Sequence, residues 1–164
     1  MIINMIYVGI DPGLHGALVA ITTKKIISIR DTPTVAVKKG KKTKNEYLVG
    51  AIVASLRKFP CDRTIVALEH VHAMPMQGTV SMWNFGRGLG LWEGIIAALG
   101  FRLERVTPQK WKKSFGLGQD KNASIVKANE LYPSYAKYFS RKKDEGRAEA
   151  LLIAHWLKTQ HDSR

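Results

Sequence analysis

Two acidic residues of this sequence stand where apolar segments end. Asp11 follows the run Met5–Ile10 and opens an Asp-Pro-Gly turn, and Glu69 closes the run Ile65–Leu68. An ionised carboxylate at the end of a segment suited to a sheet interior is unfavourable unless a cation or a hydrogen-bond donor meets it. A shared cation would satisfy both. Two simpler interpretations stay open, namely that Asp11 only caps a turn and that Glu69 pairs with a lysine.

A second pair of acids opens the strongly apolar segment near the C-terminus. Glu145 and Glu149 are four residues apart, so on a helix their side chains lie on one face, about 5–6 Å from each other, close enough to share a divalent ion. Asp144 is five residues from Glu149 and is expected to cap the helix and to face the positive end of its dipole. The choice between Asp144 and Glu145 as a further ligand stays open.

Converging carboxylates have a chemical use in phosphoryl chemistry. Two magnesium ions roughly 3.5–4 Å apart activate a water and stabilise both oxygens of an in-line displacement. Oxygen ligands select magnesium, with manganese able to substitute. Zinc is disfavoured, because Cys61 is the only cysteine and the five histidines show no tight ligand spacing except that of His70 and His72. We therefore predict a two-metal site whose ligands are Asp11, Glu69, Glu145 and Glu149.

The charge of the chain indicates a polyanionic partner. Lys and Arg number 26 against 13 Asp and Glu, a net charge of +13. Nucleic acid is the expected partner, because neutralised phosphates release counterions. An anionic membrane surface is the rival, but no segment has the amphipathic pattern of an interfacial helix, and no apolar run reaches the roughly 18 residues of a membrane span. With one cysteine and no secretion signal, the protein is expected to be soluble and intracellular.

The lysine-rich segment 38–44 is predicted to be a mobile loop, because five of its seven residues are lysine and repel one another. We expect its lysines to contact DNA. They are Lys38, Lys39, Lys41, Lys42 and Lys44.

The pattern of apolar residues predicts an α/β domain. Three consecutive strands form an antiparallel meander, and helices alternate with and then follow two further strands. The strands are Met5–Ile10, Gly16–Ile21, Ile26–Arg30, Thr64–Glu69 and Phe101–Val106; the helices are Tyr47–Phe59, Val80–Leu99, Pro108–Phe115, Lys121–Tyr132 and Glu145–Thr159. This order is that of an RNase H-like five-stranded mixed sheet, with strands 1–3 antiparallel and strands 4 and 5 parallel, in which the first and fourth strands are neighbours. Residues 1–160 are expected to form a single domain, with 161–164 as a tail.

Five stretches together resemble the RuvC-like Holliday-junction resolvases, especially the short phage-type members. Their order and spacing span nearly the whole chain. They are Gly9–Gly13, Ala67–Val71, Gln77–Gly90, Thr107–Lys112 and Gly146–Ala154. The resemblance implies a homodimer that binds four-way DNA junctions and makes paired, magnesium-dependent nicks that leave 5′-phosphate ends.

The resemblance also implies roles for single residues. The acids of the family match Asp11, Glu69, Glu145 and Glu149. Lys121 matches a lysine near the scissile phosphate, Lys112 matches a DNA-contacting lysine, and His72 stands where relatives carry an aromatic that stacks on bases. One departure concerns the last helix, where the family often spaces its acids three apart; that offset falls on Gly146.

Three other functions fit parts of the sequence. A strand followed by an Asp-containing glycine turn also begins the actin-like and sugar-kinase folds, but those need two domains around ATP, and 164 residues are too few, so no nucleotide cofactor is expected. A non-catalytic basic DNA-binding module would leave the strand-end acids unexplained. A nuclease for flaps, forks or RNA hybrids would use the same metal site, and the sequence does not separate it from a resolvase.

Overall fold

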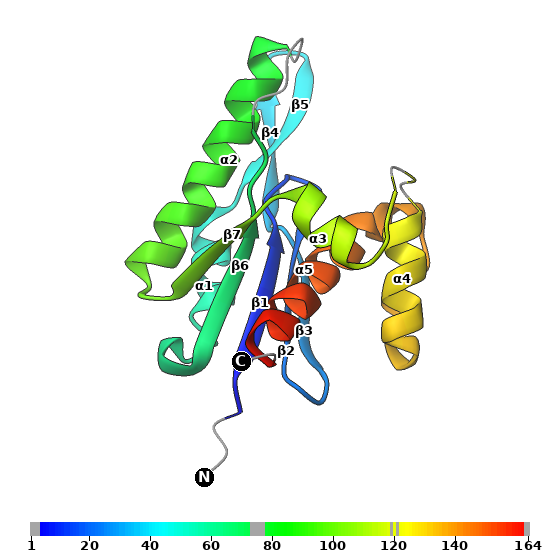
Figure 1. The fold of residues 1–164 in the computed structure, drawn as a ribbon. Coiled ribbons are helices and arrows are strands. Elements are labelled where there is room, and N and C mark those ends of the chain that lie inside the picture. The colour runs from blue at the N-terminus through cyan, green and yellow to red at the C-terminus, as the bar shows by residue number, and fades with distance from the viewer. Residues whose placement is uncertain (1–3, 73–77, 119, 121, 163–164) are drawn as a thin grey trace.

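A computed structural model describes residues 4–72, 78–118, 120 and 122–162, and its centre is a five-stranded sheet (Figure 1). The strands are β1 (Ile6–Asp11), β2 (Ala17–Ile21), β3 (Ile26–Asp31), β6 (Thr64–Glu69) and β7 (Arg102–Val106), in the spatial order β3-β2-β1-β6-β7. β2 is antiparallel to both β1 and β3, while β6 is parallel to both β1 and β7. The predicted RNase H-like sheet is confirmed, including the pairing of the first strand with the strand predicted as the fourth, β6.

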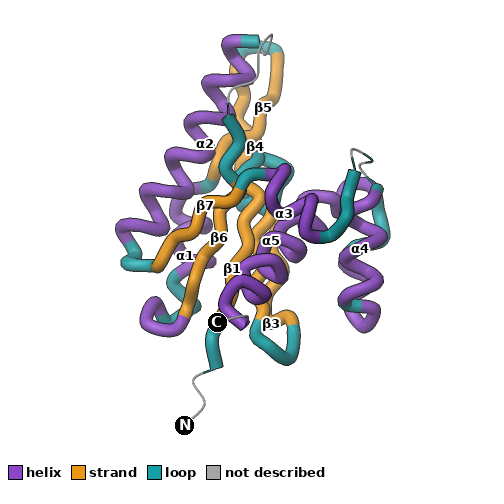
Figure 2. Tube along the Cα trace, in the orientation of Figure 1, coloured by secondary structure: helices purple, strands orange, loops and turns teal. Residues whose placement is uncertain are grey.

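Helices cover both faces of this sheet, which explains why β1 and β6 are apolar without interruption. One face is covered by α3 (Pro108–Ser114), α4 (Ala123–Leu131) and α5 (Glu145–Asp162), and the other by α1 (Val49–Leu56) and α2 (Thr79–Ala98) (Figure 2). Along β1 the side chains alternate: Tyr7 packs with the α5 layer, and Val8 and Ile10 pack with the layer of α1 and α2.

The same alternation directs the two strand-end acids toward α5. Asp11 is two positions beyond Gly9 and four beyond Tyr7, so it belongs to the α5 face of β1, and Glu69 follows Ala67 on the α5 face of β6 in the same way. The register pairs Ile10 with Leu68, which brings the next residues, Asp11 and Glu69, side by side. The sheet therefore fixes two carboxylates beneath the helix that carries the other pair.

The lysine-rich segment is not a loop, and this prediction is wrong. β4 (Thr34–Lys39) and β5 (Lys42–Tyr47) form a separate two-stranded antiparallel sheet, the β4–β5 hairpin, which projects from the main sheet (Figure 1). Gly40 has a φ of 63°, the left-handed conformation that a tight hairpin turn requires. Backbone pairing does not require the lysine side chains to be buried, so mutual repulsion only sends them outward into water.

The remaining boundaries differ from expectation by a few residues. Tyr47 closes β5, so the helix predicted to begin there starts at Val49. Short 3-10 turns cover Cys61–Arg63, Pro133–Tyr138 and Lys142–Asp144. α5 continues to Asp162, past the expected start of the tail, and His161 Nε2 lies 2.9 Å from Glu104 Oε1. Among the residues described, none of the helices has both the length and the apolar content needed to cross a membrane.

Candidate active site

Asp11 and Glu69 each accept a hydrogen bond from a defined donor. The Gly13 amide donates to Asp11 Oδ1 at 3.2 Å, across the turn that follows β1. Trp111, on α3, donates its indole N–H to Glu69 Oε1 at 2.9 Å. Trp111 is fully buried and Glu69 is 7% exposed, so this contact lies inside the molecule. One oxygen of each carboxylate is thereby oriented by the protein.

Both strand-borne carboxyls have strongly raised pKa values. Burial, with the charge of Glu149 adding to its effect, raises the pKa of Asp11 to about 7, and the Gly13 amide opposes this shift. Burial, with the charge of Asp11 adding to its effect, likewise raises the pKa of Glu69 to about 7, and the Trp111 hydrogen bond opposes it. The acids thus feel one another's charge, as groups that share a site do.

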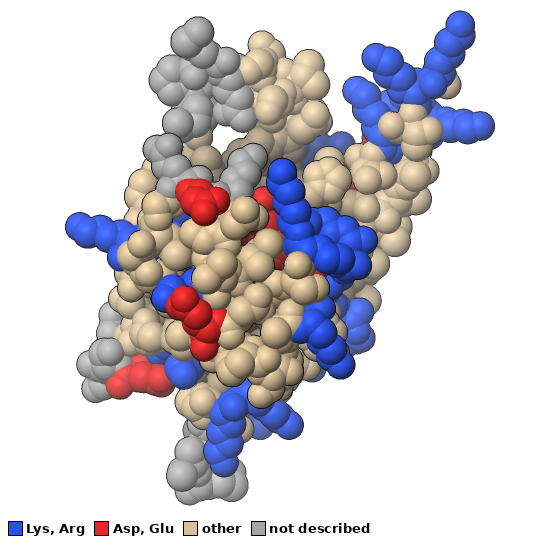
Figure 3. All heavy atoms as spheres, turned by 90° about the vertical axis from the view of Figure 1, so that its right-hand side faces the viewer, with Lys and Arg blue, Asp and Glu red and all other residues tan. Residues whose placement is uncertain are grey.

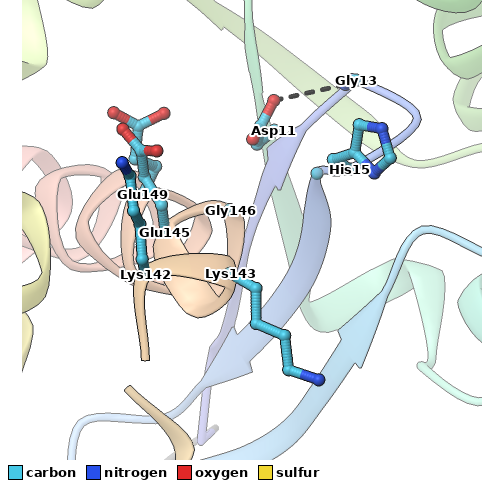
Figure 4. A pocket seen from close by; sticks show the side chains of 9 residues that line it. Asp11, Gly13, His15, Lys142, Lys143, Glu145, Gly146 and Glu149 are labelled. Atoms are coloured by element: carbon cyan, nitrogen blue, oxygen red, sulfur yellow. Dashed lines mark hydrogen bonds between the residues drawn. The ribbon is translucent and has the colours of Figure 1, made fainter. Parts of the chain in front are cut away.

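Glu145 and Glu149 complete the group on the helix side, and Figure 4 shows their side chains extending from the same face of α5. With Asp11 they line a pocket of about 400 Å³. Lys112 Nζ lies 2.8 Å from Glu149 Oε1, and the Ser124 hydroxyl donates to the same oxygen at 3.4 Å. We call Asp11, Glu69, Glu145 and Glu149 the carboxylate cluster.

Two glycines explain how α5 comes so close to the strand and the turn. A Cβ at Gly9 would lie 2.1 Å from the Ala150 carbonyl oxygen, so α5 packs directly on the β1 backbone. The space beside Gly9 is therefore filled by a helix. A Cβ at Gly146 would lie 2.4 Å from the His15 carbonyl oxygen. A side chain three residues before Glu149 cannot fit there, which accounts for the acid at position 145.

Asp144 is turned away from the cluster by two arginines. Its carboxylate accepts from Arg141 Nε at 3.1 Å and from Arg141 Nη2 at 2.9 Å, and Arg147 Nη1 lies 3.6 Å away. The hydrogen bonds from Arg141 hold the pKa of Asp144 below its usual range. Arg147 in turn pairs with both carboxylate oxygens of Asp31 at the end of β3. Asp144 therefore anchors the start of α5, which leaves Glu145 as the acid that faces the pocket.

Comparison with known proteins agrees with this architecture. No protein-family model matches the chain. The structure of Thermus thermophilus RuvC in complex with a Holliday junction substrate superposes with a TM-score of 0.58, at 13% sequence identity, over 95% of this chain and 96% of that chain. A second Thermus thermophilus RuvC structure gives 0.56 at 17% identity, over 96% and 97% of the two chains. The chain has the RuvC fold.

A curated protein adds sequence similarity to that likeness. The chloroplastic Holliday junction resolvase MOC1 of Chlamydomonas reinhardtii is 33% identical over 85 residues, which is 51% of this chain. The match spans 10% of the length of that relative. The resemblance to RuvC-like resolvases predicted from the sequence is confirmed by these similarities of fold and sequence.

Within this RuvC fold, the carboxylate cluster fits divalent ions by the chemistry of its donors. The donors are hard carboxylate oxygens, and the Lys112 ammonium contacts one of them, Glu149. Burial alone would lower the pKa of Lys112, but the hydrogen bond to Glu149 and the charges of the cluster outweigh it and raise that pKa. The surroundings of Lys112 thus favour a positive charge.

Among the residues that the structure describes, no three His, Cys, Asp or Glu side chains are close enough together to hold a metal ion as they stand.

The other residues predicted for the site fall into three places. Lys112 points into the carboxylate cluster, whereas Lys121 lies outside the described residues. His72 is exposed just after β6, and its ring lies edge-to-face with that of His70 at 4.9 Å between centroids. The lysines of segment 38–44 lie on the β4–β5 hairpin, and Figure 3 shows Lys and Arg side chains gathered on a projection of the molecule as well as next to acidic side chains.

Sequence reasoning missed three residues that touch the site. Trp111 and Ser124 each donate to one of the predicted acids, and Tyr47 reaches the turn that follows Asp11. A tryptophan beside a lysine in the first turns of a helix gave one usable signal, since a buried indole normally finds an acceptor for its N–H. Nothing in the sequence indicated which acceptor that would be.

Proposed function

We propose that this protein is a structure-selective endonuclease that resolves four-way DNA junctions by metal-dependent hydrolysis of phosphodiesters. The observation that carries the proposal is the carboxylate cluster: the half-buried Asp11 and the buried Glu69, each with a pKa of about 7, lie beside two helix acids in a fold shared with RuvC. A non-catalytic DNA-binding module has no use for acids held in so unfavourable an arrangement. The similarity to a Holliday junction resolvase supports the choice of substrate.

The residues divide the chemistry among themselves. Asp11, Glu69, Glu145 and Glu149 would hold two magnesium ions, with manganese able to substitute. Bound ions of this kind supply Lewis-acid activation of a water and neutralise charge on the scissile phosphate. Lys112, which contacts Glu149, would neutralise charge on the scissile phosphate. We assign Lys121 the same kind of charge neutralisation. The expected products carry 5′-phosphate ends.

The hairpin lysines and His72 are assigned to DNA binding. The exposed lysines on β4 and β5 attract phosphates without reading sequence, and the exposed His72 stacks on bases near the junction centre. Paired cuts at a two-fold symmetric junction require two active sites, so the working form is proposed to be a homodimer.

The test is cleavage of synthetic four-way, flap and linear duplex DNA, each with and without magnesium, with products mapped at nucleotide resolution. Paired, symmetrically placed nicks in the four-way junction, absent without metal, are the expected result. Cutting of flaps at equal rates would point to a broader branched-DNA nuclease. Tight binding without any cut, in magnesium or manganese, would leave only the DNA-binding module. Sedimentation of the protein with and without DNA checks the homodimer.

A further inference from the structure

Tyr47 connects the β4–β5 hairpin to the turn that carries Asp11. It is the last residue of β5 and is half-buried, and its hydroxyl donates to the Pro12 carbonyl oxygen at 2.9 Å. Pro12 immediately follows Asp11, and within the same turn the Gly13 amide holds the Asp11 carboxylate. The Tyr47 side chain of the hairpin is therefore hydrogen-bonded to the backbone one residue away from Asp11, a member of the carboxylate cluster.

The helix α2 is shaped to let Tyr47 reach that position. A Cβ at Gly88 would lie 2.2 Å from the Tyr47 hydroxyl oxygen and 2.8 Å from the ring carbon that bears it. Gly88 is buried, whereas a Cβ at the exposed Gly86 would meet nothing within 4 Å. Within the glycine-rich stretch singled out in the sequence, position 88 is thus the one that seats the tyrosine.

A second backbone tie joins the same two regions. The Thr32 amide, just before β4, donates to the Gly16 carbonyl oxygen at 2.9 Å, and the Leu48 amide, just after β5, donates to the Pro33 carbonyl oxygen at 2.9 Å. The base of the hairpin is closed on itself and is attached to the loop after Asp11 near both of its ends, at Pro12 and at Gly16. A displacement of the hairpin base must therefore move this loop.

The surface where the hairpin meets the loop after Asp11 suits a phosphate. The hairpin, the loop after Asp11 and α2 line a pocket of about 380 Å³ that includes Lys39, Lys44, His15 and Arg87 as well as Tyr47. DNA entering this pocket would touch the hairpin and the loop at once.

We propose that Tyr47 is a positioning residue that transmits DNA engagement by the hairpin to the Asp11 turn. The inference rests on the proposed nuclease function. The Tyr47 hydroxyl, which packs against Gly88, holds the backbone that orients Asp11. Loss of this hydroxyl should therefore slow the catalytic step and loosen the turn while leaving DNA binding unchanged.

The test compares Tyr47→Phe with Tyr135→Phe. The Tyr135 hydroxyl also donates to a backbone carbonyl, that of Ile26, at 3.2 Å, so the control removes the same kind of bond elsewhere. For Tyr47→Phe we expect kcat for junction cleavage to fall by on the order of 10-fold, as for other groups that orient ligands. Junction affinity in calcium should be unchanged, and hydrogen–deuterium exchange of the peptide covering 11–16 should speed up. Tyr135→Phe should change none of the three.

A second pair of variants covers the case in which Tyr47→Phe does not fold. Gly88→Ala should displace the tyrosine and reproduce the loss of kcat and the faster exchange, while Gly86→Ala, an equal gain in helix propensity, should not. Wild-type kcat and exchange in Tyr47→Phe, or a loss confined to affinity, would overturn the inference. If the wild-type protein cuts no branched DNA, the proposed function fails, and the exchange measurement still decides whether Tyr47 orders the turn.

Discussion

The carboxylate cluster and the β4–β5 hairpin are built in opposite ways. The cluster lies on the neighbouring strands β1 and β6 and on α5, and the backbones of α5 and β1 meet at Gly9 without intervening side chains. The hairpin is a separate two-stranded sheet whose lysines face solvent. A reaction centre needs fixed groups in a medium of low polarity, whereas attraction of a polyanion needs only charge with reach. Changes in the cluster should therefore alter rate, and changes in the exposed lysines of the hairpin should alter affinity and its salt dependence.

The largest effect is expected from removing a strand-borne acid. Asp11→Asn and Glu69→Gln should each lower the cleavage rate by more than about 10³-fold, because an amide is a poor magnesium ligand and the rest of the cluster does not compensate. Junction affinity, measured by gel shift in EDTA, should stay close to wild type, since neither side chain carries positive charge. Single-turnover cleavage measures the rate. Either variant cutting at nearly the wild-type rate would exclude the cluster as the reaction centre.

The same acids should make the metal-free protein less stable as pH rises. Because the pKa of Asp11 is raised to about 7 in the folded state but is near 4 when unfolded, the folded state binds more protons between these values. The free energy of unfolding therefore falls as pH increases from about 4 to about 7, by on the order of a few kcal/mol relative to Asp11→Asn.

Urea unfolding in EDTA at several pH values measures this difference. The variant should become the more stable protein above pH 7, and magnesium should restore the wild type. If the free energies of unfolding of the two proteins change with pH in parallel, ionisation of Asp11 does not destabilise the folded state.

The prediction of the cluster rested on local pattern and on the order of elements. Asp11 and Glu69 each end an apolar run, and the expectation that the first and fourth strands are neighbours put them side by side, as the pairing of β1 with β6 does. The helical spacing of Glu145 and Glu149 was equally local. What local pattern could not supply is contact between distant segments: the Trp111 to Glu69 bond spans 42 residues and the Tyr47 to Pro12 bond spans 35.

The hairpin was missed for a different reason. The prediction considered repulsion among the lysine side chains. It left out the backbone pairing that Val35, Val37 and Thr43 favour and that Gly40 allows. Charge patterning reports on solvent exposure and partners. It says little about whether an exposed segment is regular.

An intermediate effect is expected at Trp111, which supports the cluster without belonging to it. Trp111→Phe keeps a large ring in the core but removes the donor to Glu69, so the magnesium concentration for half-maximal cleavage should rise by about 10–100-fold. Trp92→Phe is the matched control, because Trp92 is also fully buried and its indole N–H has no partner among the described residues. Equal behaviour of the two variants would mean that the Trp111 bond does not orient Glu69.

Substitutions of Glu145 and Asp144, the neighbouring acids at the start of α5, should affect different properties, the response to magnesium and the stability. Glu145→Gln should weaken the response to magnesium with little change in thermal stability, because Glu145 lines the pocket. Asp144→Asn should leave the response to magnesium intact and lower stability by about 1–3 kcal/mol, since it loses charge-assisted bonds to Arg141. Magnesium titration of cleavage and urea unfolding of both variants test this. The reverse pattern would make Asp144 the ligand.

The smallest effect is expected on the hairpin side. Replacing Lys41 and Lys42 by alanine should leave the cleavage rate at saturating DNA unchanged but should reduce the slope of log affinity against log salt by up to about 2, close to one for each phosphate that the protein no longer neutralises. Lys24→Ala with Lys25→Ala, in the exposed turn between β2 and β3, removes the same charge at the opposite end of the sheet and is expected to change the slope less (Figure 1). Filter binding to a four-way junction across a range of salt concentrations measures both slopes. Because overall charge attraction is the same for the two double variants, a difference between them indicates that DNA touches the hairpin, and equal slopes would show that these lysines act only through net charge.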